Sequence, residues 1–209
     1  MIVVFDLDDT LYNEMDFVKS GFKAVSLLFS DSSYVYNSLL TIFSEFGSGT
    51  TFNRLLDDFN TDVSVQDCIE VYRNHDPDIM LSQENDDLLN ELSKEYTLGV
   101  LTDGNALVQK KKFAKLGLDK YIDMVVFSGE YGLCKPDISL YKRFHKKYGD
   151  QDYVYVADNL KKDFVATNKL NWNSIHYRNP NGVYINESPP ENGSPNYSIR
   201  VLSELKEYL

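Results

Sequence analysis

Residues 2–12 read IVVFDLDDTLY, an apolar run that breaks abruptly into the aspartates Asp6, Asp8 and Asp9. The apolar part is typical of a strand that is buried on both faces, as the strands of parallel sheets are. Carboxylates at the end of such a strand repel one another and are costly to desolvate unless a cation or a proton offsets their charge. Because ligands bind at the carboxyl ends of strands in open α/β sheets, the aspartates indicate a metal site or a nucleophile. The alternative is an Asp-rich turn in which the side chains bond nearby backbone amides.

The length and charge of the chain exclude several classes of protein. Its 209 residues allow one large domain or a core with a small insert. The net charge of −11 argues against nucleic-acid binding, which requires Lys and Arg to replace phosphate counterions. The apolar runs are too short to cross a membrane, and no cationic region followed by an apolar one starts the chain, so we expect no membrane association. Cys68 and Cys134 lack metal-ligand spacing and predict reduced thiols in a cytoplasmic protein.

Short apolar runs alternate with helical patterns through most of the chain. The predicted strands are residues 2–6, 98–102, 123–127, 153–157 and 173–177, and the predicted helices are residues 105–116, 138–148 and 160–170. Strands that alternate with helices of this length predict βαβ units, and hence an α/β fold with a parallel sheet covered on both faces. We expect surface loops over residues 178–196, and a short strand or turn followed by a helix over residues 197–208.

Residues 14–90 have a different pattern. They contain no β-branched run of strand length, but their apolar residues recur at helical spacing, as Phe17, Phe22, Val25 and Leu28 do. We therefore predict two domains: a core of residues 1–13 and 91–209, and an α-helical cap of residues 14–90. A helical cap above a site at the strand ends would act as a lid that excludes water and selects the substrate.

Polar clusters follow four of the predicted strands. They comprise Asp6 with Asp8, then Thr102 with Asp103 and Gly104, then Lys135, and finally Asp158 with Asp163. Since the carboxyl ends of parallel strands meet at one edge of a sheet, all four clusters can converge on a single point.

These clusters contain the groups that phosphoryl transfer needs. Asp6, held by its strand, can attack phosphorus and form an aspartyl-phosphate. Asp8 is placed to protonate the leaving oxygen and later to deprotonate the attacking water. Lys135 supplies a fixed positive charge against the phosphoryl oxygens.

The remaining polar residues predict a metal site and a phosphate site. Mg²⁺ prefers oxygen ligands and can clamp a phosphoryl group, so we expect Asp6 and Asp158 to bind it, with Asp163 in support. Thr102 offers a hydroxyl group, and Gly104 lets backbone amides approach a phosphate at a helix N-terminus.

The segments FDLDDTLY, LTDGN, CKPD and ADNLKKDF, in this order along the chain, resemble the motifs of the haloacid dehalogenase superfamily. The resemblance implies a Rossmann-like core with a helical cap inserted after the first motif. It implies that Asp6 is the nucleophile and that Asp8 is the acid/base, with the backbone carbonyl of Asp8 on Mg²⁺. The founding dehalogenases lack an acid at the position of Asp8, so its presence favours phosphoryl transfer over carbon–halogen cleavage.

The same resemblance assigns the other motif residues. Thr102 and Lys135 would bind and stabilise the phosphate, and Asp158 and Asp163 would hold the metal. Asp103 stands where many members of the family have Asn, so we expect its backbone amide to be functional and its carboxylate to turn outward. We expect Asp9 to be a helix cap or a structural acid.

The predicted function is Mg²⁺-dependent hydrolysis of a small phosphorylated metabolite by a cytoplasmic monomer or dimer. Two alternatives remain open at this point. One is a phosphomutase on the same scaffold, and the other is a non-catalytic regulatory member of the family.

Overall fold

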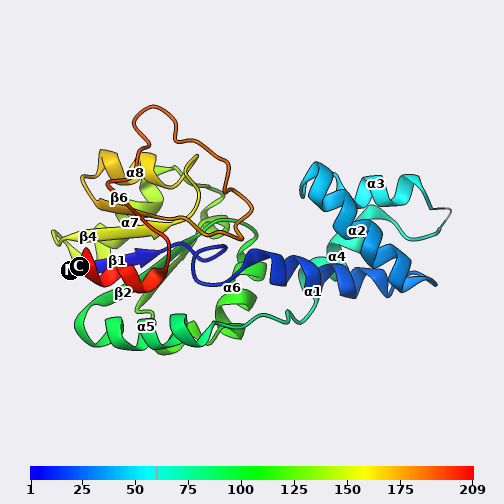
Figure 1. The fold of residues 1–209 in the computed structure, drawn as a ribbon, viewed down its shortest axis with the longest axis horizontal. Coiled ribbons are helices and arrows are strands. Elements are labelled where there is room, and N and C mark those ends of the chain that lie inside the picture. The colour runs from blue at the N-terminus through cyan, green and yellow to red at the C-terminus, as the bar shows by residue number, and fades with distance from the viewer. Residues whose placement is uncertain (60) are drawn as a thin grey trace. The chain divides into compact units, whose positions relative to one another are not determined.

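A computed structural model describes residues 1–59 and 61–209, which form two compact units (Figure 1). The sheet unit comprises Met1–Glu14 and Met80–Leu209, and the insert unit comprises Met15–Ile79. The predicted cap extended to residue 90, but residues 80–90 belong to the sheet unit. The reason is that helix α5 (Gln83–Glu95) buries Leu88, Leu89 and Leu92 within the sheet unit, where it contacts β2 and the C-terminal 3₁₀ segment.

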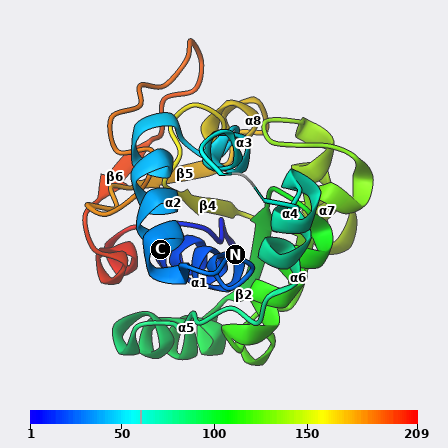
Figure 2. The same ribbon diagram turned by 90° about the vertical axis from the view of Figure 1, so that its right-hand side faces the viewer.

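The sheet unit contains a six-stranded parallel sheet in the order β3-β2-β1-β4-β5-β6. Its strands are β1 (Ile2–Phe5), β2 (Thr97–Thr102), β3 (Met124–Phe127), β4 (Tyr153–Ala157), β5 (Asn173–Tyr177) and β6 (Tyr197–Ile199). This order is that of the Rossmann fold, which confirms the predicted fold class. Figure 2 shows β6, β5 and β4 following one another across the sheet.

Helices lie on both sides of this sheet. Every residue of β1 and β4 is buried, which explains why their sequences are continuous apolar runs. Helices α7 (Ile138–Tyr148) and α8 (Phe164–Lys169) cover one face, where Tyr141 and Phe164 belong to one buried cluster with Tyr155 of β4. Figure 1 shows α5 on the opposite side from α8, and helix α6 (Ala106–Lys115) follows β2.

Two predicted helices differ from the structure. Helix α8 starts at Phe164 and not at residue 160, because residues 159–163 form a turn in which the Asn159 amide donates to the Asp163 carboxylate at 3.1 Å. The tail forms the predicted short strand, but a 3₁₀ segment (Leu202–Glu207) follows it in place of an α-helix. Shorter 3₁₀ segments are Leu118–Lys120 and Ser128–Tyr131.

The insert unit is built from helices. They are α1 (Glu14–Ser26, whose first residue lies in the sheet unit), α2 (Ser32–Phe46), α3 (Thr51–Asp57) and α4 (Val65–Asn74). Their apolar faces form one core around Phe22, Val25 and Leu39, in which Phe22 contacts the rings of Phe43 and Phe52 edge to face. Within the described residues, none of the helices is long and apolar enough to cross a membrane.

Candidate active site

The four predicted clusters lie at the carboxyl ends of the strands of the sheet unit. Strands β1 and β4 are neighbours at the point where the strand order reverses, which is where open α/β sheets bind ligands. Asp6 follows β1 and Asp158 follows β4, and the Asp6 amide donates to the Val156 carbonyl at 2.9 Å. The chain topology therefore places these two carboxylates side by side.

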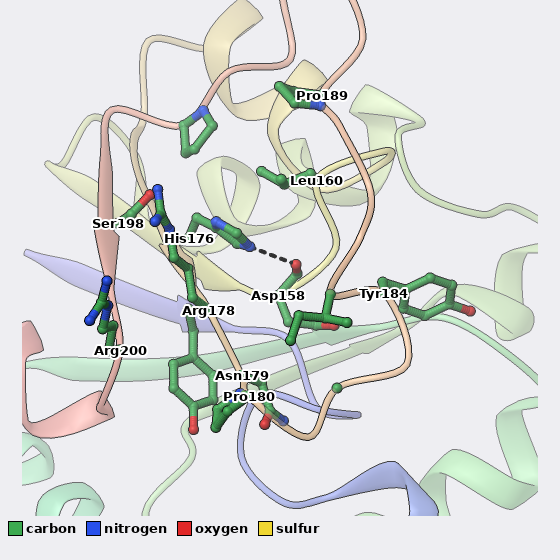
Figure 3. A pocket seen from close by; sticks show the side chains of 14 residues that line it. Asp158, Leu160, His176, Arg178, Asn179, Pro180, Tyr184, Pro189, Ser198 and Arg200 are labelled. Atoms are coloured by element: carbon green, nitrogen blue, oxygen red, sulfur yellow. Dashed lines mark hydrogen bonds between the residues drawn. The ribbon is translucent and has the colours of Figure 1, made fainter.

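Two cavities open at this edge of the sheet. The larger, about 700 Å³, lies between β5, β6 and the loop of residues 178–196, and includes His176, Arg178 and Arg200 in its lining (Figure 3). The smaller, about 230 Å³, is lined by residues of the first, second and fourth motifs, including Asp6, Asp8, Thr102, Asp103, Gly104 and Asp158. Asp158 and Tyr184 line both cavities. The smaller cavity is the candidate active site, because it holds the groups that the chemistry requires.

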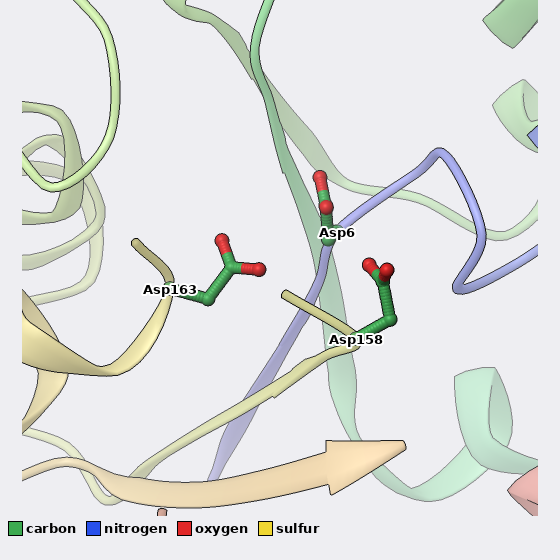
Figure 4. A group of neighbouring side chains, drawn as sticks. All are labelled: Asp6, Asp158 and Asp163. Atoms are coloured by element: carbon green, nitrogen blue, oxygen red, sulfur yellow. The ribbon is translucent and has the colours of Figure 1, made fainter. Parts of the chain in front are cut away.

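Asp6, Asp158 and Asp163 form a cluster of buried carboxylates (Figure 4). Each offers one oxygen atom, and these three atoms lie within 4.8 Å of one another. Burial, followed by the charges of Asp6 and Asp163, raises the pKa of Asp158 to about 9. A divalent cation would offset this repulsion, and an all-oxygen donor set is the one that Mg²⁺ prefers, so these residues fit the predicted metal.

Lys135 lies fully buried beside this cluster. Its Nζ atom is 2.8 Å from Asp6 Oδ1 and 2.7 Å from Asp163 Oδ1, and it donates to the Tyr155 hydroxyl at 3.1 Å. Burial opposes the charge of Lys135, but the carboxylates of Asp163 and Asp6 outweigh it and hold the pKa of the ammonium well above its usual value. Burial outweighs the opposing charge of Lys135 and raises the pKa of Asp6 to about 6.

Thr102, Asp103 and Gly104 follow one another at the end of β2. Gly104 has φ of 120°, which favours glycine over residues with a side chain. The expectation that the Asp103 carboxylate turns outward is wrong, because its side chain is only 16% exposed. It accepts the backbone N–H of Lys135 at 3.0 Å and the Lys162 ammonium at 3.1 Å. Asp103 therefore anchors the segment that carries Lys135.

Asp8 accepts hydrogen bonds from three side chains. The Tyr12 hydroxyl (2.5 Å) and the Lys112 ammonium (2.7 Å) donate to Oδ1, and the Gln109 amide (2.7 Å) donates to Oδ2. Burial acts to raise the pKa of Asp8, but Lys112 and the three hydrogen bonds together lower it. The Asp8 side chain thus lies outside the metal cluster, and only its backbone carbonyl is left for the predicted metal contact.

Asp9 has the structural role that we expected. Its carboxylate accepts the backbone N–H of Glu14, the first residue of α1, at 2.8 Å, and that of Val183 at 2.8 Å. The Asn179 side chain also donates to the Asp9 carbonyl at 2.8 Å. The loop of residues 178–196, predicted only as a surface loop, is therefore tied to the first motif.

Several polar residues at the site were not predicted, among them Gln109, Lys112, Lys162, Glu14 and Asn159. Gln109 and Lys112 are three positions apart in the helix after LTDGN, so their spacing on one helix face was a usable signal. Lys162 lies within the fourth motif, where a basic residue beside an acidic cluster could have been read as its counter-charge.

Comparison with known proteins agrees with this geometry. A model of the haloacid dehalogenase-like hydrolase family matches residues 3–177. The chain belongs to this family. Membership confirms the resemblance seen in the motifs and, because several curated relatives are named phosphatases, it supports the predicted class of enzyme.

Individual relatives of this hydrolase cover most of its length. A protein of Methanocaldococcus jannaschii named glyceraldehyde 3-phosphate phosphatase is 28% identical, covering 97% of this chain and 94% of its own. The pyrimidine 5′-nucleotidase YjjG of Escherichia coli is 25% identical over 58% of this chain and 53% of its own. The crystal structure of the HAD-hydrolase YfnB from Bacillus subtilis bound to magnesium has a TM-score of 0.73 at 19% identity, covering 100% of this chain and 97% of that one.

Proposed function

We propose that the protein is a Mg²⁺-dependent phosphatase that hydrolyses a small phosphate monoester through an aspartyl-phosphate on Asp6. The observation that carries this proposal is the Asp6 carboxylate itself, which lies buried at the end of β1, 2.8 Å from the Lys135 ammonium. A rigid, ionised carboxylate beside a fixed cation is what attack on an anionic phosphoryl group requires.

In the first displacement, an Asp6 oxygen forms a bond to phosphorus while the bond to the leaving oxygen breaks. The proton that Asp8 takes from water in the second displacement of one turnover is given to this oxygen in the next turnover, so the product leaves as an alcohol. The Thr102 hydroxyl, which lines the cavity, and the Lys135 ammonium, which contacts Asp6, stabilise the phosphoryl oxygens. Mg²⁺, which Asp6, Asp158 and Asp163 would hold with the Asp8 carbonyl, supplies further positive charge against these oxygens.

In the second displacement, the Asp8 carboxylate takes a proton from a water molecule. The water oxygen bonds to phosphorus, the bond between phosphorus and Asp6 breaks, and inorganic phosphate leaves with the Asp6 carboxylate restored. The donors that surround Asp8 favour its ionised form, which is the form that this step uses.

The names of the relatives and the size of the site support a small phosphorylated substrate. Relatives from Methanocaldococcus jannaschii and Methanothermobacter thermautotrophicus, which match nearly the whole chain, are named glyceraldehyde 3-phosphate phosphatase. A cavity of about 230 Å³ in the sheet unit accommodates a phosphate group with a short carbon chain. Glyceraldehyde 3-phosphate is therefore the first substrate to test. The acidic chain favours metabolites over nucleic acid as substrates, and the two free cysteines favour a cytoplasmic protein.

The test is phosphate release from glyceraldehyde 3-phosphate, other sugar phosphates and nucleotides, with and without Mg²⁺. Asp6→Asn should lower kcat by at least about 10³-fold, since removing a nucleophile removes most of the catalysis. The exposed Asp150→Asn is the matched control and should keep wild-type activity. EDTA should abolish turnover and added Mg²⁺ should restore it.

Either of two results would reject this proposal. One is the absence of phosphate release from every compound by the wild-type protein. The other is full activity in Asp6→Asn. An isomerised sugar phosphate without net phosphate release would support the phosphomutase alternative instead.

A further inference from the structure

Gln109 connects the phosphate-binding part of the site to its acid/base. We propose that Gln109 is a positioning residue, which turns the Thr102 hydroxyl toward the substrate phosphate and fixes the Asp8 carboxylate beside it. This inference rests on the proposed phosphatase function and extends it to a side chain outside the sequence motifs.

The contacts of Gln109 are short and protected from water. The residue lies in α6 and is 3% exposed. Its Nε2 atom is 2.7 Å from Asp8 Oδ2 and 2.6 Å from Thr102 Oγ1. One buried amide nitrogen therefore bridges the proposed acid/base, Asp8, and the proposed phosphate-binding hydroxyl of Thr102.

The chemistry of the three groups fixes the direction of each hydrogen bond. The nitrogen of the Gln109 amide faces both Asp8 Oδ2 and Thr102 Oγ1, and an amide nitrogen can only donate. This nitrogen carries two hydrogen atoms, one for Asp8 and one for Thr102. Thr102 Oγ1 thus acts as an acceptor toward Gln109, and its own hydrogen must point elsewhere.

The remaining direction for the Thr102 hydrogen is the cavity. Thr102 lines the 230 Å³ cavity together with Asp6 and Asp8. Among the described residues, the side-chain hydrogen bond found at Thr102 is the one that it accepts from Gln109. A phosphoryl oxygen in the cavity would provide the missing acceptor.

Gln109 also fixes the rotation of the Asp8 carboxylate. Lys112 and Tyr12 bind one carboxylate oxygen, and Gln109 binds the other. If the amide were removed, the Thr102 hydroxyl could donate directly to the freed Asp8 oxygen. The phosphate would then lose a donor, and the acid/base would be turned away from the leaving group.

The test compares Gln109→Met with Lys110→Met. Methionine keeps the length of Gln109 but removes both donors, and Lys110 is the next residue of the same helix, with its side chain 50% exposed. Rates are measured on phenyl phosphates of graded leaving-group acidity and on an alkyl phosphate. We expect Gln109→Met to lower kcat about 10²-fold on the alkyl phosphate and much less on the most acidic phenol, because poor leaving groups depend most on proton donation. Lys110→Met should match the wild type.

A purely structural role would lower all of these rates by the same factor. Such a uniform loss, or kinetics in Gln109→Met equal to those of Lys110→Met, overturns the inference while leaving the proposed function intact. Melting curves establish that the variants are folded. If Gln109→Met does not fold, Gln109→Ala, which also removes both donors and adds no charge, takes its place and should show the same dependence on the leaving group.

Binding of inorganic phosphate tests the Thr102 contact without any turnover. Calorimetry in the presence of Mg²⁺ should show about 10-fold weaker binding to Gln109→Met, equivalent to one hydrogen bond to a charged group. In a double-mutant cycle, adding Gln109→Met to Thr102→Val should weaken binding little further, since Gln109 acts through Thr102. Fully additive losses overturn the inference, even if the protein hydrolyses none of the phosphate esters.

Discussion

The sheet unit and the insert unit bury different kinds of side chain. The described part of the sheet unit buries Asp6, Asp9, Lys112, Lys135, Asp158 and Asp163. Within residues 15–59 and 61–79 of the insert unit, the buried polar residues are only Ser26 and Thr51, whose hydroxyls donate to the backbone carbonyls of Lys23 and Gly47. The core of the insert is otherwise aliphatic and aromatic.

The residues that we propose for the reaction are thus buried in the sheet unit, whereas the insert unit is held together by apolar packing. Buried charges are costly and persist where other charges or a cation offset them, so their concentration around β1 and β4 supports our proposal that the reaction takes place there. The insert lacks such a cluster in its described residues, and its stability depends on close packing of apolar groups. Mutations in the two units should therefore have different consequences.

Lys135→Met should have the largest effect. It removes the cation that lies 2.8 Å from Asp6 and 2.7 Å from Asp163, and leaves buried carboxylates without their partner. We expect a loss of about 3–5 kcal/mol in the free energy of unfolding. We also expect a fall in kcat of at least about 10²-fold, because a fixed charge against the phosphoryl oxygens is lost.

Denaturant unfolding and phosphate release measure these two effects. Lys146→Met, an exposed lysine of α7 in the same unit, is the control and should change neither. A Lys135→Met protein that is as stable as the wild type would mean that the buried charges are not coupled as the distances indicate.

Leu39→Ala tests the core of the insert unit. Leu39 is fully buried, and truncating a buried leucine costs about 2–5 kcal/mol. Leu27→Ala is the control in the same unit, because Leu27 is 73% exposed. The destabilisation should be confined to the insert and should be visible as faster reaction of Cys68, a buried member of that core, with a thiol reagent.

The two cysteines make this measurement specific to one unit. At pH 8 the exposed Cys134 of the sheet unit should react at once. Burial raises the pKa of Cys68 to about 11, so its thiol should react only when the insert opens, and Leu39→Ala should speed this reaction at least about 30-fold. An acid with a raised pKa in the folded state stabilises the fold less as pH rises, so labelling should accelerate further between pH 9 and 11. Equal reactivity of both cysteines at pH 8 would contradict the packing of the insert.

The sequence predicted the sheet and the motif clusters well, for a physical reason. Strands buried on both faces appear as uninterrupted apolar runs, and their carboxyl ends must meet at one edge of a parallel sheet. The convergence of Asp6 and Asp158 therefore depends on topology alone, which local patterns reveal.

Features that depend on long-range packing were missed or wrongly predicted. Helix α5 has the same amphipathic pattern as a helix of the insert, and only the burial of its leucines within the sheet unit assigns it there. Asp103 turns inward because a backbone N–H of a distant segment meets it, which its own neighbours along the chain do not indicate. In α6 the apolar residue is exposed and the charged residue is buried: Leu107 is 75% exposed whereas Lys112 is 4% exposed. Hydrophobic periodicity predicts the opposite placement, because it contains no information about the carboxylate of Asp8.

A matched pair of helix caps gives the smallest expected effects and the closest comparison of the two units. Asn105 caps α6 by accepting the N–H groups of Leu107 and Val108, and Ser64 caps α4 of the insert by accepting that of Asp67. Replacing either cap by alanine should cost about 1 kcal/mol in the free energy of unfolding.

The kinetic consequences of these two substitutions should differ although their costs in stability are alike. Asn105→Ala loosens the first turn of the helix that carries Gln109 and Lys112, so the rate on an alkyl phosphate should fall more than the rate on an aryl phosphate. Ser64→Ala should leave the ratio of these rates unchanged, because α4 contributes none of the reacting groups described. If the ratio changes in Ser64→Ala and stays constant in Asn105→Ala, the assignment of the acid/base machinery to the sheet unit alone is wrong.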